Sequence, residues 1–191
     1  PEQVLLYPSS DALPYEHMSP GSEVLGQRLR ALATLAQAGS GERGAQNDEG
    51  GSGQALPAPH SSPVIVAPVK ALLQPTLSPA ELRFGSSELR TGDEQPQDAL
   101  MRRWVELGYR VAPTVEEQGE LSRRGGIVDI WPMGDAQPLR VEWFGDEIDS
   151  LRRFDPLTQR SEQRIPAASV GPPHEFPLWR RREAIAALRA V

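Results

Sequence analysis

Short apolar runs and one longer helical pattern divide the first eighty residues of the chain. Residues 4–7 and 64–68 are rich in Val, Leu and Ile and end at proline, which is typical of buried strands. Between them, residues 24–35 carry Leu and Val at spacings of three and four, which predicts an amphipathic helix. A short helix is predicted at 69–73, and Ser78-Pro79-Ala80-Glu81 resembles a further helix start. Two buried strands joined by a helix indicate part of a parallel sheet.

Residues 38–63 differ in character from everything around them. They are dominated by Gly, Ser, Ala and Pro and contain no aromatic residue and a single Leu. Such a segment buries too little apolar surface to offset the entropy of ordering it. We therefore predict a disordered insertion at 38–63. The G-x-G-x-x-G match at 39–44 lies inside it, without the flanking strand and helix that a dinucleotide site needs, and is treated as accidental.

Alternation at period two becomes the main signal in the second half of the chain. An amphipathic helix is predicted at 97–107, stopped by Gly108, followed by a short strand at 109–111. Three strands are then predicted at 126–131, 139–144 and 147–154. Gly145-Asp146 joins the last two as a type II′ hairpin turn. This half indicates a small α+β domain with an antiparallel meander, after which a final helix is predicted at 178–191.

Composition excludes several classes of function. The 191 residues include no cysteine, and the three histidines lie far apart, so neither a thiol nucleophile nor a metal site is expected. Lys70 is the single lysine and stands between Val69 and Ala71, so the chain contains no P-loop and no cofactor is expected. The net charge of −6 argues against a protein that coats DNA. No run is long enough to span a membrane, and a cytoplasmic location is expected. Because the chain begins with Pro1, we expect it to be a piece of a longer protein.

One strand carries the most informative pattern. Along residues 139–144, side chains alternate between two faces, so Arg140, Glu142 and Phe144 share the face opposite the core residues Leu139, Val141 and Trp143. A cation, an anion and a ring together suit a protein partner. Periodicity alone favours the simpler interpretation, an ordinary solvated face with one exposed aromatic residue.

Two groups of arginines leave similar alternatives open. Arg123 and Arg124 precede a Gly pair, and Arg180-Arg181-Arg182 open the predicted terminal helix. Either group is suited to phosphate contact, but solvated charge on a turn or a helix surface is the simpler interpretation of both. The sequence pattern does not decide between these interpretations.

Several segments together resemble a known family. They are residues 124–132, 140–150, 153–161 and 174–177, with further matches at 13–16, 28–29 and 64–69. With these residues the chain resembles the UvrB-homology module of bacterial excision-repair proteins along nearly its whole length except 38–63. Pro132-Met133-Gly134 is similar to the transcription-repair coupling factors (Mfd) of this family, and Ser122 stands where UvrB has an arginine.

The resemblance implies a fold and a set of site residues. It implies an α/β fold, a fragment of a degenerate P-loop-like parallel-sheet domain that does not hydrolyse ATP, with an inserted α+β domain that binds UvrA. Residues 1–82 and 166–191 would belong to the larger domain and 83–165 to the insert. Carried over by position, the UvrA-binding residues are Arg124, Arg140, Glu142 and Phe144.

The function that this resemblance implies is recruitment rather than catalysis. The module would bring UvrA to transcription-coupled nucleotide excision repair, within a parent protein that binds RNA polymerase and DNA and whose other domains mask the UvrA face. The alternatives are a UvrB fragment that acts in damage recognition and a DNA-contacting piece of a repair ATPase.

Overall fold

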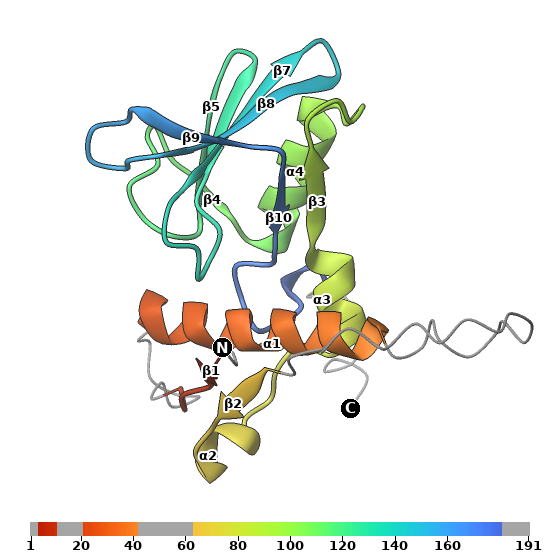
Figure 1. Cartoon of the computed structure of the whole chain (residues 1–191), viewed down its shortest axis with the longest axis vertical. Helices are drawn as coiled ribbons and strands as arrows, with labels where there is room; N and C mark the ends of the chain where they lie inside the picture. Colours follow the sequence, from red (N-terminus) through yellow and green to blue (C-terminus); the bar gives the residue numbers. More distant parts are fainter. Residues whose placement is uncertain (1–3, 11–20, 42–62, 181–191) are drawn as a thin grey trace, which may run out of the picture. The chain divides into compact units, whose positions relative to one another are not determined.

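The chain divides into two compact units, Pro1–Gln74 and Pro75–Val191. The computed structural model describes residues 4–10, 21–41 and 63–180 (Figure 1). Each unit is described by itself. The second unit begins before helix α3 (Pro79–Gly85), so the whole of that helix lies within it.

The first unit is a parallel strand pair with two helices. Strands β1 (Val4–Leu6) and β2 (Val64–Val66) pair in parallel, as predicted. The prediction that they are buried strands is wrong for most of their side chains, because Val4, Leu6, Val64 and Val66 are exposed. The helices are α1 (Ser22–Gly41) and α2 (Val69–Leu72). Buried Leu5, Tyr7, Ala31 and Ala71 form its core. Helix α1 includes residues 38–41 of the predicted insertion. The rest of the insertion up to residue 62, and the family match at 13–16, lie outside the described residues.

The second unit is built on a six-stranded sheet with the order β4-β5-β6-β7-β8-β9. Its strands are β4 (Arg110–Val111), β5 (Glu120–Arg124), β6 (Ile127–Ile130), β7 (Leu139–Phe144), β8 (Glu147–Phe154) and β9 (Ser161–Ile165). Strands β5 to β9 form an antiparallel meander, and β4 pairs with β5 in parallel. A separate antiparallel pair joins β3 (Ser87–Arg90) to β10 (Ala167–Val170). The predicted meander is therefore present, and it is longer than predicted.

Local signals fix the ends of the helices in this unit. Ser78 caps α3 in a capping box, because its side chain accepts from the Glu81 amide while the Glu81 carboxylate accepts from the Ser78 amide. Helix α4 (Gln97–Leu107) ends at Gly108, whose φ of 111° lies in the left-handed region. At the start of the predicted terminal helix the structure has a 3₁₀ turn, Leu178–Arg180, and residues 181–191 of that prediction lie outside the described residues.

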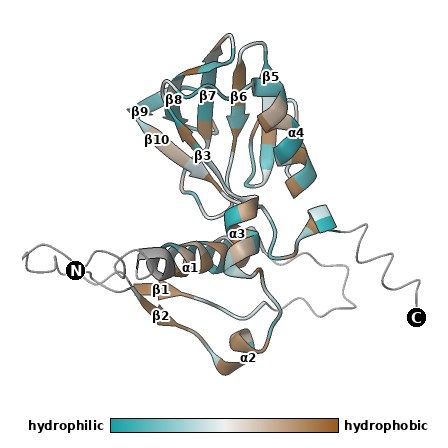
Figure 2. Ribbon diagram, turned by 90° about the vertical axis from the view of Figure 1, so that its right-hand side faces the viewer, coloured by the Kyte–Doolittle hydropathy of each residue, from teal (hydrophilic) through white to brown (hydrophobic). Residues whose placement is uncertain are grey.

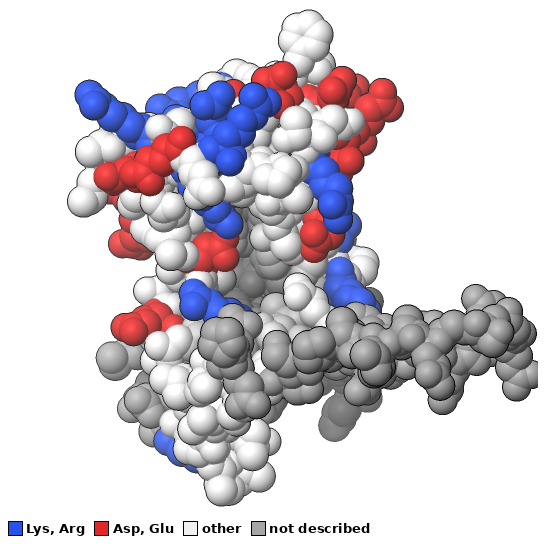
Figure 3. Space-filling view, viewed as in Figure 1, with Lys and Arg blue, Asp and Glu red and all other residues white. Residues whose placement is uncertain are grey.

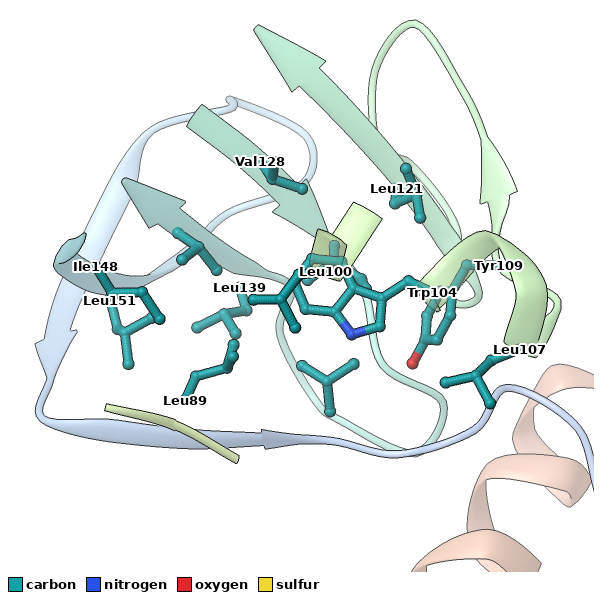
Figure 4. Close-up of a cluster of buried hydrophobic side chains, with 13 residues drawn as sticks. Leu89, Leu100, Trp104, Leu107, Tyr109, Leu121, Val128, Leu139, Ile148 and Leu151 are labelled. Atoms are coloured by element: carbon teal, nitrogen blue, oxygen red, sulfur yellow. The ribbon is translucent and has the colours of Figure 1, made fainter. Parts of the chain in front are cut away.

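Helix α4 covers one face of the sheet and supplies the centre of the core. Trp104 and Leu100 project from α4 among side chains of the strands, and Trp104 is fully buried (Figure 4). Removing so large a buried ring typically costs about 3–5 kcal/mol. Brown and teal positions alternate along the strands of the sheet, as expected where one face packs and the other does not (Figure 2). The face opposite α4 is therefore where polar strand residues gather.

The β7–β8 hairpin has an irregular register. Gly145 takes a φ of 64° and Asp146 has no positive φ, as the predicted type II′ turn requires. Glu142 pairs with Ser150 but Trp143 pairs with Ile148, so Asp149 is an extra residue on β8. This β-bulge shifts the alternation of β8 by one position. As a result Ile148 and Leu151 both face the core, and Ser150 lies opposite Glu142.

Candidate interaction face

Polar side chains occupy the sheet face that lies opposite the core. In the space-filling view, acidic and basic residues are interspersed over the sheet-bearing unit (Figure 3). The strand register places the residues of this face directly or diagonally opposite one another on neighbouring strands. We call this set the polar face. It consists of Ser122, Arg124, Asp129, Arg140, Glu142, Phe144, Ser150, Arg152 and Arg164.

Asp129 is the buried centre of the polar face. Its side chain is 1% exposed and accepts hydrogen bonds from two arginines. Arg140 donates from Nε to Oδ1 at 2.7 Å and from Nη2 to Oδ2 at 3.0 Å, a bidentate pair. Arg124 donates from Nη2 to Oδ2 at 2.8 Å. One carboxylate on β6 thus holds an arginine from β5 and another from β7.

Arg140 is fixed from several sides. Its Nη1 donates to Ser161 Oγ at 3.0 Å, and its guanidinium lies 4.7 Å from the centre of the buried Phe154 ring. The hydrogen bond to Asp129 raises the pKa of Arg140. Its side chain is 14% exposed. Arg140 lies on the predicted face, yet most of its surface is used to hold the sheet and the start of β9 together.

Arg124 differs from its neighbour Arg123. The Arg124 side chain is 52% exposed and lies opposite Ile127 on the polar face. Arg123 is on the other side of β5, where it pairs with Asp98 of α4 at 2.6 Å. The two adjacent arginines therefore serve different surfaces, and only Arg124 belongs to the polar face.

Glu142 is tied to the next strand. Ser150 Oγ donates to Glu142 Oε2 at 2.6 Å, and Arg152 Nε lies 3.9 Å from Oε1. The register also places Glu142 beside Ile127, which pairs with Arg124. Glu142 and Arg124 therefore flank one intermediate strand and contribute opposite charges to the same row.

Phe144 is the apolar member of the face. Its side chain is 83% exposed at the end of β7, just before the hairpin turn. The preceding Trp143 packs against the core, and its Nε1 donates to the backbone oxygen of Gln95 at 2.8 Å. Phe144 thus presents a full aromatic ring to water from a strand that is itself well fixed. An isolated exposed ring on a rigid support is suited to insertion into a partner.

The structure brings the predicted residues onto one surface and adds others to it. Arg124 and Arg140 meet at Asp129, and Glu142 lies in the same part of the sheet. Sequence reasoning missed Asp129, Arg152 and Arg164. An Asp between Val128 and Ile130 in an apolar strand was a usable signal, because Asp is depleted in strands and rarely buried without partners.

The described residues offer little for other chemistry. No group of three or more metal-ligating side chains gathers among them. No helix in the described part of the chain is long and apolar enough to cross a membrane.

The segment that carries the polar face and its exposed ring matches a known protein family. Residues 88–176 match the family described as "UvrB interaction domain". This segment contains the whole polar face.

Along nearly its whole length the chain is similar to transcription-repair-coupling factors. It is 33% identical to that of Haemophilus influenzae over 92% of this chain, and 34% identical to that of Myxococcus xanthus over 99%. It is 38% identical to that of Mycobacterium bovis over 84% of this chain. The chain spans only 13%, 14% and 12% of the length of these relatives, respectively.

Proposed function

We propose that this chain is a non-catalytic docking module that recruits UvrA in transcription-coupled nucleotide excision repair. The observation that carries the proposal is the 83% exposed ring of Phe144 next to a preorganised arginine network. An exposed aromatic anchor beside charged groups is the usual composition of an interface hot spot. The similarity to transcription-repair-coupling factors supports the biological setting.

The four proposed UvrA-binding residues have different roles. Phe144 is the apolar anchor. Arg124 is half exposed and already oriented by Asp129, so it pairs with a partner carboxylate at little cost in side-chain entropy. Arg140 acts mainly by supporting this arrangement, since it is 14% exposed. Glu142 adds a negative group that fixes the orientation of the partner. An interface of ordinary size on this face would bury about 800 Å² per partner.

The rest of the proposal concerns the longer protein from which such a module comes. The first unit, with its parallel β1–β2 pair, is proposed to be part of a degenerate P-loop-like domain that binds no nucleotide. Residues 83–165 carry the UvrA face. Other domains of the parent mask this face until the parent, bound to RNA polymerase and DNA, meets a stalled transcription complex.

Calorimetric titration of UvrA into the full 191-residue chain tests the proposal. Phe144→Ala should weaken binding by about 2 kcal/mol or more, roughly thirtyfold, while the melting temperature stays nearly unchanged because the residue is 83% exposed. Val105→Ala is the matched control, since Val105 is 45% exposed on α4 at the other face of the sheet. Equal affinity of wild type, Phe144→Ala and Arg124→Ala would contradict the proposal, as would absence of binding by wild type.

A further inference from the structure

Three arginines stand side by side across the last three strands of the sheet. Arg140 on β7 pairs directly with Arg152 on β8, and Arg152 pairs directly with Arg164 on β9. Side chains at directly opposite positions have Cβ atoms about 5 Å apart, and like charges there destabilise the sheet. This row of cations is therefore unfavourable for the fold by itself.

Only the first of these charges has a close carboxylate partner within the described residues, and it shares that partner with Arg124. Arg140 has the buried carboxylate of Asp129. Arg152 comes within 3.9 Å of Glu142, whose carboxylate is already engaged by Ser150. Arg164 donates to the backbone oxygen of Asp149 at 3.0 Å, and in the described part of the chain it forms no ion pair with a carboxylate.

The surroundings of Arg152 and Arg164 keep both groups accessible. The Arg152 side chain is 35% exposed, and Arg164 is exposed on the edge strand β9. Ile165, the next residue of β9, packs against the core and so directs Arg164 to the polar face. Both guanidinium groups thus lie on the surface that carries Phe144 and Arg124.

We propose that Arg152 and Arg164 together bind carboxylate side chains of the protein that docks on the polar face. This inference rests on the proposed function and extends its interface from the hairpin across β8 to the sheet edge. A guanidinium pairs bidentately with a carboxylate, and one acidic group between two adjacent arginines relieves the repulsion between them. The occupant is therefore an acidic segment of UvrA.

The mixture of charges and the exposed ring favour a protein surface over nucleic acid. Glu142 lies next to Arg152, and the exposed Asp149 lies earlier on the same strand as Arg152. A continuous phosphate backbone would therefore meet negative groups. The exposed Phe144 ring offers apolar contact that a protein partner uses and a phosphate backbone does not. The chain as a whole carries a net charge of −6.

The test uses Arg152→Gln, Arg164→Gln and the double variant in the full chain, titrated with purified UvrA at several salt concentrations. Each single variant should weaken binding about fivefold or more at low salt and flatten its salt dependence. Each should also keep or raise the melting temperature, because a like-charge contact is removed. Arg102→Gln is the control, since Arg102 is exposed on α4 at the opposite face. It should leave affinity unchanged.

The outcomes separate this inference from the proposed function. If Phe144→Ala abolishes binding while both Gln variants bind as wild type, the carboxylate site is wrong and the docking proposal stands. If wild type fails to bind UvrA, the docking proposal itself fails. If wild type binds duplex DNA and the Gln variants lose that binding, the pair serves phosphate, and our inference is overturned. Reduced UvrA affinity together with unchanged or higher melting temperature supports it.

Discussion

Asp129 and Arg140 form a bidentate ion pair across β6 and β7, with donor–acceptor distances of 2.7 and 3.0 Å. The carboxylate is 1% exposed and the guanidinium 14%. The pair depends most on the carboxylate, because loss of Asp129 would leave Arg140 without its charge partner, whereas Asp129 also has Arg124. The same carboxylate also orients Arg124, so Asp129 supports both the stability of the sheet and the proposed binding surface.

Asp129→Asn is expected to destabilise the chain. Asparagine keeps the shape but removes the charge that compensates Arg140, and the free energy of unfolding should fall by about 2 kcal/mol or more. Urea unfolding followed by tryptophan fluorescence measures this. Asp98→Asn breaks the exposed pair with Arg123 and should cost less than about 0.5 kcal/mol. Equal losses in the two variants would show that Asp129 has no special role.

Gly108→Ala should be more damaging than Gly92→Ala. Both glycines have left-handed φ angles, 111° and 92°, so both substitutions strain the backbone by about 1 kcal/mol or more. At Gly108 an added Cβ would also lie 2.7 Å from His174 Cδ2, whereas at Gly92 nothing lies within 4 Å. The difference between the two unfolding free energies therefore measures the steric contribution, and a difference near zero would mean that His174 moves aside freely.

His174 should make the stability of the chain depend on pH. Burial lowers the pKa of His174 below its usual 6.5, an effect opposed by a hydrogen bond to the backbone of Gly108. Between the ordinary pKa of about 6.5 in the unfolded chain and the lower pKa in the folded chain, the unfolded chain binds more protons than the folded chain. The free energy of unfolding therefore falls as the pH decreases through this range. Chemical unfolding at a series of pH values should show this slope. His174→Gln retains both other histidines and should flatten it; an unchanged slope would assign the effect elsewhere.

Trp143→Phe should loosen the hairpin that presents Phe144. The substitution removes the 2.8 Å hydrogen bond to the Gln95 backbone and should cost about 1 kcal/mol of stability. Trp131→Phe is the matched control. It also removes one indole hydrogen bond, to the backbone oxygen of Asp135, but that bond lies within a single loop. We expect similar losses in urea unfolding and a lower affinity for UvrA in Trp143→Phe alone. Equal affinities would show that the tether does not affect docking.

Strong periodicity allowed the hairpin and helix α4 to be predicted from sequence. The predicted strand at 139–144 coincides with β7, and the predicted helix at 97–107 coincides with α4. Strands β5 and β9 were missed because Glu120–Arg124 and Ser161–Ile165 are mainly polar. Their place in the sheet comes from pairing with neighbours, which a local pattern does not contain.

The candidate face could be predicted only in part for a related reason. Alternation along β7 put Arg140, Glu142 and Phe144 on one face, and burial of Leu139 and Val141 agrees with it. That Asp129 sits between two arginines depends on the register of three strands. Alternation also does not predict how far a side chain on that face is buried by residues distant in sequence. Arg140 is largely enclosed by such residues, Phe154 and Ser161. The functional role of these residues stays a prediction.

The extra residue at Asp149 has a consequence for how this hairpin can change. Because Asp149 is the residue without a pairing partner on β7, removing it would leave Ile148, Ser150, Leu151 and Arg152 in regular alternation, with Leu151 still in the core and Arg152 still on the polar face. A hairpin shortened by this one residue would therefore keep the same side chains in the core and the same arginine row along the remainder of β8.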